Sequence, residues 1–209
     1  MTTTDHRDGD AGRPTLTFSL PNILTYSRIL AVPLVVLCFY LEGSLQTQER
    51  SSDWVRWLAL AIFALASITD FFDGYLARAW DQSSSIGRML DPIADKLLVA
   101  ACLLVLAADG TIAGWTTWAA FIILSREILV SGLREYLAEL KVSVPVTRLA
   151  KWKTTAQMVA IGFLLAGPAG EKVVPWTTEI GLTLLWIAAL LTMYTGYDYF
   201  RAGIKHVVD

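Results

Sequence analysis

Six apolar stretches recur along this 209-residue chain, most of them at or above the roughly 20 residues that cross a bilayer as a helix. Short polar segments separate them, and several are longer than the minimum, which implies tilt or helical extensions beyond the membrane. Hydrophobic residues make up 55% and charged residues 17%, a balance unlike that of a soluble domain. We therefore predict an all-α integral membrane protein with six transmembrane helices. The predicted spans are Ile23–Leu41, Trp54–Ala79, Ile86–Ala108, Ile112–Leu140, Leu149–Ala166 and Thr177–Phe200.

The placement of Lys and Arg predicts the orientation of these spans. Of the 17 basic residues, 14 fall on the side that holds both termini, and only Arg50, Arg56 and Lys172 fall on the other. Cytoplasmic loops are enriched in Lys and Arg. We expect both termini in the cytoplasm, with a bacterial plasma membrane as the location because no transit peptide is visible.

The N-terminal segment differs from the rest of the chain. Residues 1–14 are polar and lack an apolar run, which predicts a disordered cytoplasmic tail before one domain at 15–209. Leu16, Phe18 and Leu20 precede Pro21 and predict a short interfacial segment that leads into the first span.

The net charge and the two cysteines bear on nucleic-acid binding, disulfides and metal sites. The net charge of −2 is too small to indicate nucleic-acid binding. Cys38 and Cys102 both lie inside apolar runs, where a thiol behaves as a small hydrophobic group, so neither a disulfide nor a metal site is inferred from them.

Four aspartates stand in two pairs on either side of a short polar connection. Asp70 and Asp73 are three residues apart, and Asp91 and Asp95 are four apart, so each pair shares one face of a helix. Four carboxylates brought together repel one another and need a cation between them. Oxygen ligands favour hard ions such as Mg²⁺, Mn²⁺ or Ca²⁺, and four carboxylates suffice for two ions.

The aspartates belong to a longer pattern, Asp70-x2-Asp73-Gly74-x2-Ala77-Arg78-x8-Gly87-x3-Asp91-x3-Asp95. This pattern resembles the complete signature of the CDP-alcohol phosphatidyltransferases, integral membrane enzymes of phospholipid synthesis. The resemblance implies that Asp70, Asp73 and Asp91 bind two metal ions, Mg²⁺ or Mn²⁺. It also implies that Asp95 is the general base and contacts metal as well.

A second group of residues is expected to bind CDP-diacylglycerol. Gly74 and Ala77 would let a flat cytosine ring approach, although small residues equally suit close helix packing. Arg78 suits a bidentate grip on phosphate but could also be a snorkelling cation at the interface. The segment LPN-x-LT-x2-R resembles the part of the family that lines the nucleotide site, and Pro-Asn could otherwise belong to a helix N-cap. The residues assigned to this site are Asn22, Thr25, Arg28, Gly74, Ala77, Arg78, Ser84 and Gly87.

Basic residues in the second half of the chain predict an anionic acceptor. Arg126 lies within an apolar run beside Glu127, and an ionisable group at such a position is a functional candidate. For the lysines of the loop, positive-inside topology alone is an equal alternative. The residues assigned to the acceptor phosphate are Arg126, Arg134, Arg148, Lys151 and Lys153.

The stretches REI-x2-SGLRE and K-x-KTT-x-QM are similar to those of the phosphatidylglycerophosphate synthases within this family. The resemblance implies transfer of a phosphatidyl group from CDP-diacylglycerol to sn-glycerol 3-phosphate by a homodimer among membrane lipids. Phosphatidylglycerol or inositol phosphate remains an alternative acceptor. An ion-coupled transporter is disfavoured, because the carboxylates gather at one end and no repeat is visible.

Overall fold

The protein is all-helical in the part of the chain that the computed structural model describes, residues 20–47, 52–80, 85–142 and 148–204. The predicted tail at 1–14 and the interfacial segment before residue 20 lie outside these ranges. The six helices are α1 (Leu20–Thr47), α2 (Asp53–Trp80), α3 (Ser85–Ala108), α4 (Thr116–Glu139), α5 (Arg148–Glu171) and α6 (Thr177–Ile204).

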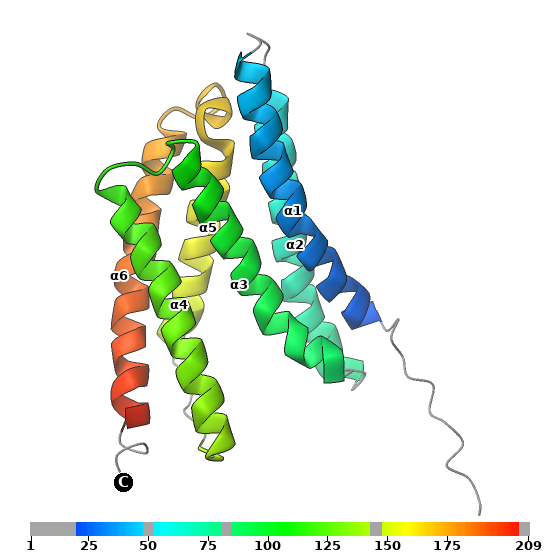
Figure 1. Cartoon of the computed structure of the whole chain (residues 1–209), viewed down its shortest axis with the longest axis vertical. Coiled ribbons are helices and arrows are strands. Elements are labelled where there is room, and N and C mark those ends of the chain that lie inside the picture. The colour runs from blue at the N-terminus through cyan, green and yellow to red at the C-terminus, as the bar shows by residue number, and fades with distance from the viewer. Residues whose placement is uncertain (1–19, 48–51, 81–84, 143–147, 205–209) are drawn as a thin grey trace, which may run out of the picture.

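Successive helices run in alternating directions, so the bundle has two distinct ends (Figure 1). We call the end where α2 finishes and α3 begins, with Asp91 and Asp95 in the early turns of α3, the aspartate end. Residues 109–115, which join α3 to α4, lie at the opposite end. The described chain begins and finishes at the aspartate end, at Leu20 and Ile204.

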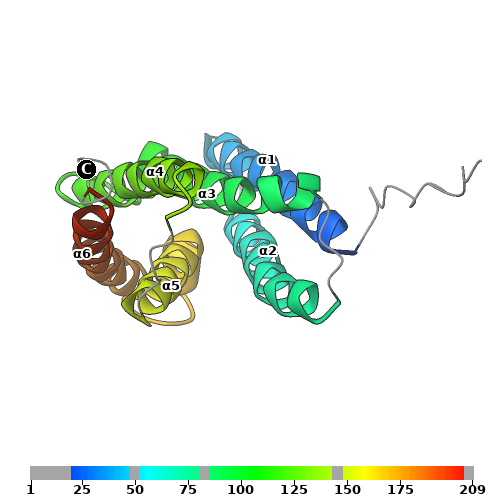
Figure 2. The ribbon, with the colours of Figure 1, turned by 90° about the horizontal axis from the view of Figure 1, so that it is seen from below.

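The helices pack as two groups that α3 and α5 connect. Helix α1 contacts α2 and α3, while α6 contacts α4 and α5. Helix α5 also packs on α2, and α3 runs diagonally between the two groups (Figures 1 and 2). The buried core contains residues from all six helices, including Val35, Phe63, Leu103, Ile123, Leu164 and Leu185.

Large apolar side chains also cover much of the outside. Leu30, Leu104, Leu129 and Leu190 are each at least 60% exposed, as expected for surfaces that face lipid rather than water. Within the described residues, three helical segments are long and apolar enough to cross a membrane: Ile23–Gln46, Thr116–Glu139 and Thr177–Arg201. Cys38 and Cys102 are both buried as free thiols.

One predicted helix boundary was wrong, and helix α5 extends beyond its predicted span. The fourth helix begins at Thr116 rather than Ile112, because Gly110 and Gly114 have positive φ angles of 82° and 56° and turn the chain. Helix α5 continues past Ala166 to Glu171 through a kink at Gly167, whose φ of 43° and ψ of −130° are not helical. Pro168 follows and cannot donate a backbone hydrogen bond, which accounts for the break.

Candidate active site

The two carboxylates on α3 are held by two side chains from α1. Thr25 Oγ1 donates a hydrogen bond to Oδ1 of Asp91. The guanidinium of Arg28 donates from Nη1 to Oδ1 of Asp95 at 2.6 Å, and its Nη2 lies 3.7 Å from Oδ1 of Asp91. The carboxylates are therefore oriented from one side by a hydroxyl and a cation.

Burial differs sharply between the two sides of this contact. Thr25 and Arg28 are each 1% exposed, whereas the side chains of Asp91 and Asp95 remain 45% exposed. Residues three apart on α1 share a face, which directs Thr25 and Arg28 together toward α3. A buried guanidinium is costly unless it is paired, and the two carboxylates provide that pairing.

The other signature residues share this end of the bundle. Asp70 and Asp73 lie in the last turns of α2, together with Gly74, Ala77 and Arg78, and Gly87 lies in the first turn of α3. Their side chains, and that of Asn22 in the first turn of α1, fall outside the described part of the chain, as does all of Ser84. The backbone thus brings the predicted residues on α1, α2 and α3 to one end, and their individual roles stay predictions.

The donor set of the α3 pair fits a hard cation. Asp91 and Asp95 present carboxylate oxygens one turn apart on one helix face, and both side chains are accessible. With only two of the four aspartates described, the described side chains do not include three acidic groups around one point. The two on α2 would have to complete the site.

A separate charged cluster joins α4, α5 and α6. Glu127 Oε1 accepts a hydrogen bond from Nζ of Lys153 and lies 3.4 Å from Nη1 of Arg126. Arg126 also donates from Nε to the backbone oxygen of Thr192 at 3.1 Å and from Nη2 to Oγ1 of Thr195 at 3.2 Å. Gly196 leaves room for this side chain, because a Cβ there would lie 2.9 Å from Cγ of Arg126.

These contacts divide the predicted acceptor-binding residues into those enclosed in the bundle and those that are accessible. Arg126 is turned onto α6, and Lys153 is only 6% exposed, so both cations are engaged inside the bundle. Arg134 is exposed, and its guanidinium carbon lies 5.7 Å from the centre of the Tyr199 ring. Arg148 and Lys151 begin α5, with side chains outside the described part.

Two polar residues on α4 and α5 had no role predicted from the sequence. Glu127 was noted only as a neighbour of Arg126, yet it is the carboxylate that pairs with Lys153. Gln157 is 4% exposed, and its Oε1 has no hydrogen-bond partner among the described residues. Gln157 follows Lys153 by one helical turn, and two polar side chains on one face of an apolar helix were the available signal.

A bundle of apolar helices with carboxylates oriented at one end is typical of a helical membrane protein with a polar site at that end of the bundle. The model of the CDP-alcohol phosphatidyltransferase family matches residues 18–194, and the chain belongs to this family.

Several bacterial relatives are named CDP-diacylglycerol–glycerol-3-phosphate 3-phosphatidyltransferase. The chain is 46% identical to the one from Rickettsia felis over 188 residues, which covers 90% of this chain and 97% of the relative. It is 40% identical to the one from Cereibacter sphaeroides, covering 93% and 99%, and 40% identical to the one from Shigella flexneri serotype 5b, covering 92% and 98%.

Proposed function

We propose that this chain transfers the phosphatidyl group of CDP-diacylglycerol to sn-glycerol 3-phosphate and releases CMP. The family match and the names of relatives at 40–47% identity support this activity. The structural observation that carries it is the pair of accessible carboxylates on α3, Asp91 and Asp95, held from behind by Thr25 and Arg28. These four residues come from the two sequence segments that resemble the family's site.

Asp70, Asp73, Asp91 and Asp95 would together hold the metal, Mg²⁺ or Mn²⁺, in two positions. When bound, the ions would neutralise phosphate charge and stabilise the leaving group as Lewis acids. Thr25 and Arg28 orient the ligands on α3, as partners of metal-binding side chains commonly do. The remaining signature residues, including Arg78 and Ser84, are proposed to contact the nucleotide and its phosphates.

Asp95 would act on the acceptor. Its carboxylate takes the proton of the acceptor's C1 hydroxyl, whose oxygen attacks the phosphorus on the lipid side of the pyrophosphate. The bond from that phosphorus to the bridging oxygen breaks, and CMP leaves with the electron pair. Because the Asp95 side chain is 45% exposed while Arg28 fixes its orientation, an incoming hydroxyl has access to a positioned base.

The basic residues on α4 and α5 would hold the acceptor phosphate. Arg134 is exposed and lies near the aspartate end of α4, and Arg148 and Lys151 begin α5 at the same end. Lys153 is buried in its contact with Glu127, and Arg126 is half-buried and bonded to α6, so their contribution would be to position this part of the site.

The membrane arrangement is also part of the proposal. All six helices are 24–28 residues long, which exceeds the roughly 20 residues that a span requires. The excess of Lys and Arg at the aspartate end supports cytoplasmic termini and a site that opens to the cytoplasm. A homodimer in a bacterial plasma membrane is proposed from the family resemblance.

The test is release of CMP by the purified protein in detergent with CDP-diacylglycerol and Mg²⁺. We expect release with sn-glycerol 3-phosphate, loss in Asp95→Asn, and full activity in the matched control Asp53→Asn at the other end of the bundle. Faster release of CMP with phosphatidylglycerol or inositol phosphate would assign that molecule as the acceptor instead. A folded, metal-loaded protein that releases CMP with none of the three would refute the activity.

A further inference from the structure

The face of α6 that packs on α4 carries an aromatic residue between two glycines. Gly196, Tyr199 and Gly203 are separated by three and four residues, so they share one side of the helix. Both glycines are in close contact with α4: a Cβ on Gly196 would lie 2.9 Å from a side-chain carbon of α4, and one on Gly203 would lie 3.0 Å from another. Because α4 and α6 run in the same direction, Tyr199 lies between these two contacts, opposite Arg134 (Figure 1).

The guanidinium of Arg134 lies over the ring of Tyr199. Its central carbon is 5.7 Å from the centre of the ring, within the roughly 6 Å over which the face of an aromatic ring attracts a cation. This attraction uses the charge of the guanidinium and none of its N–H groups, which remain available to oxygen acceptors. Among the described residues, none accepts a hydrogen bond from Arg134 or forms an ion pair with it. Arg134 is therefore oriented and still has its donors unused.

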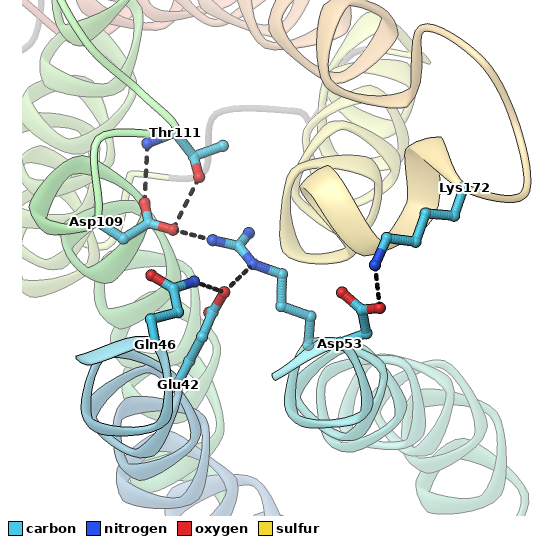
Figure 3. Close-up of polar contacts among 7 residues, drawn as sticks. Glu42, Gln46, Asp53, Asp109, Thr111 and Lys172 are labelled. Atoms are coloured by element: carbon cyan, nitrogen blue, oxygen red, sulfur yellow. Dashed lines mark hydrogen bonds and ion pairs between the residues drawn. The ribbon is translucent and has the colours of Figure 1, made fainter. Parts of the chain in front are cut away.

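Arg56, at the opposite end of the bundle, is held by carboxylates instead. It donates from Nε to Oε1 of Glu42 at 2.6 Å and from Nη2 to Oδ2 of Asp109, which follows α3. Figure 3 shows the carboxylates of Glu42 and Asp109 on two sides of this network. Arg56 is only 5% exposed, so it holds helices together and does not face a ligand, unlike the exposed Arg134.

Positive charge gathers around Arg134. Arg126 and Lys153 both interact with it electrostatically. Glu127 is the carboxylate that opposes them, and it already pairs with Lys153 and Arg126. The cluster thus holds three cations and one carboxylate, and this excess of positive charge favours an anionic ligand. A phosphate monoester supplies the charge together with oxygens that match the planar fork of a guanidinium.

The contact with the ring prepares Arg134 for binding. An exposed arginine side chain can adopt many rotamers, and a ligand that binds it must restrict them. The ring of Tyr199 restricts them before the ligand arrives, so the ligand binds more tightly. For an exposed cation–π contact, this corresponds to about two- to fivefold in affinity.

We propose that Tyr199 is a positioning residue for the acceptor, and that its ring holds Arg134 with the N–H donors facing the acceptor's phosphate monoester. This proposal rests on the proposed function and adds to it a residue of the last helix. Tyr199 lies beyond residue 194, where the family match ends, so the resemblance assigns it no role.

The experiment measures initial rates of CMP release by the purified protein in detergent, with sn-glycerol 3-phosphate and CDP-diacylglycerol varied in turn. In Tyr199→Leu, which removes the ring, we expect the KM for glycerol 3-phosphate to rise about two- to fivefold, with kcat and the KM for CDP-diacylglycerol unchanged. Tyr199→Phe keeps the ring and should match the wild type. Tyr197→Leu is the matched control, since Tyr197 is 64% exposed and lies on another side of α6. Tyr199→Met, a second variant without a ring, is measured in parallel so that the result does not depend on the folding of one protein.

A double-mutant cycle separates positioning from a general structural role. Arg134→Met removes the charge and should raise the same KM by more than Tyr199→Leu does. In the Arg134→Met background, Tyr199→Leu should raise the KM no further, because the two residues act through one contact. Effects that multiply would overturn the proposal. A rise in the KM for CDP-diacylglycerol in place of the acceptor would also overturn it, because Arg134 would then contact the phosphates of the donor.

The wild-type rate separates this proposal from the proposed function. A wild type that releases CMP with glycerol 3-phosphate, together with an unchanged KM in Tyr199→Leu and Tyr199→Met, would refute the positioning role alone. A folded wild type that releases CMP with no acceptor would refute the proposed function and this inference with it.

Discussion

Replacing Thr25 with Val tests whether the α1 contacts prepare the metal ligands on α3. Valine has nearly the same shape, so the substitution removes the hydrogen bond to Asp91 and keeps the volume of the side chain. A hydrogen bond to a charged group contributes about 1.5–3 kcal/mol, and loss of a partner that orients a metal ligand typically costs about 10–100-fold. Because the Asp91 side chain is 45% exposed, water replaces part of the lost bond, which places the effect near the lower limit.

We therefore expect the Mg²⁺ concentration that gives half-maximal CMP release to rise about tenfold in Thr25→Val, with a smaller change in rate at saturating Mg²⁺. Thr25→Ser keeps the hydroxyl and should restore most of the metal affinity. Ser27→Ala is the control on the same helix, since the Ser27 hydroxyl bonds locally, to the backbone oxygen of Leu24. An unchanged Mg²⁺ dependence in Thr25→Val, or an equal defect in Thr25→Ser, would refute the reasoning.

Three further outcomes are expected. Glu127→Gln leaves the buried amine of Lys153 without its carboxylate and should lower the free energy of unfolding by about 3 kcal/mol, seen as a lower melting temperature in detergent, whereas Glu139→Gln on the exposed face should not. Gly167→Ala places a Cβ in a left-handed conformation against a guanidinium and should cost about 1–3 kcal/mol, while Gly132→Ala, with open space around it, should be neutral or stabilising; equal melting temperatures would contradict this. Removal of divalent metal with EDTA should abolish CMP release and added Mg²⁺ or Mn²⁺ should restore it, and activity that persists in EDTA would exclude a metal-dependent reaction.

The sequence predicted the six helices well because their lengths follow from the apolar stretches, which are local. It placed the start of α4 at Ile112 instead of Thr116, and it did not indicate the kink at Gly167, where the close approach of Arg56 from another helix leaves no room for a Cβ.

Contacts between distant residues could not be predicted. Thr25 and Arg28 were assigned to the nucleotide by resemblance, and nothing local indicated that their partners would be Asp91 and Asp95, 66 and 67 residues away. The network around Arg56 was missed for the same reason. Only Arg56 enters the count of basic residues for topology, although Glu42, Arg56 and Asp109 flank three consecutive apolar stretches on the same side of the predicted bundle, which was a usable signal.

Two charged side chains on α1 lie closer together along the helix axis than a typical bilayer is thick, and this affects the surrounding lipid. Arg28 and Glu42 are both buried and fourteen residues apart, so only roughly 21 Å of helix separates them. The hydrocarbon core of a typical bilayer is about 30 Å thick, which is enough to cover both side chains. Glu42 is enclosed and paired with Arg56, but the carboxylates paired with Arg28 are accessible, so the membrane there thins or water reaches inward from the aspartate end. Shorter acyl chains in the host bilayer therefore relieve this mismatch, and the rate of the enzyme should depend on bilayer thickness even when the substrate's own chains are held constant.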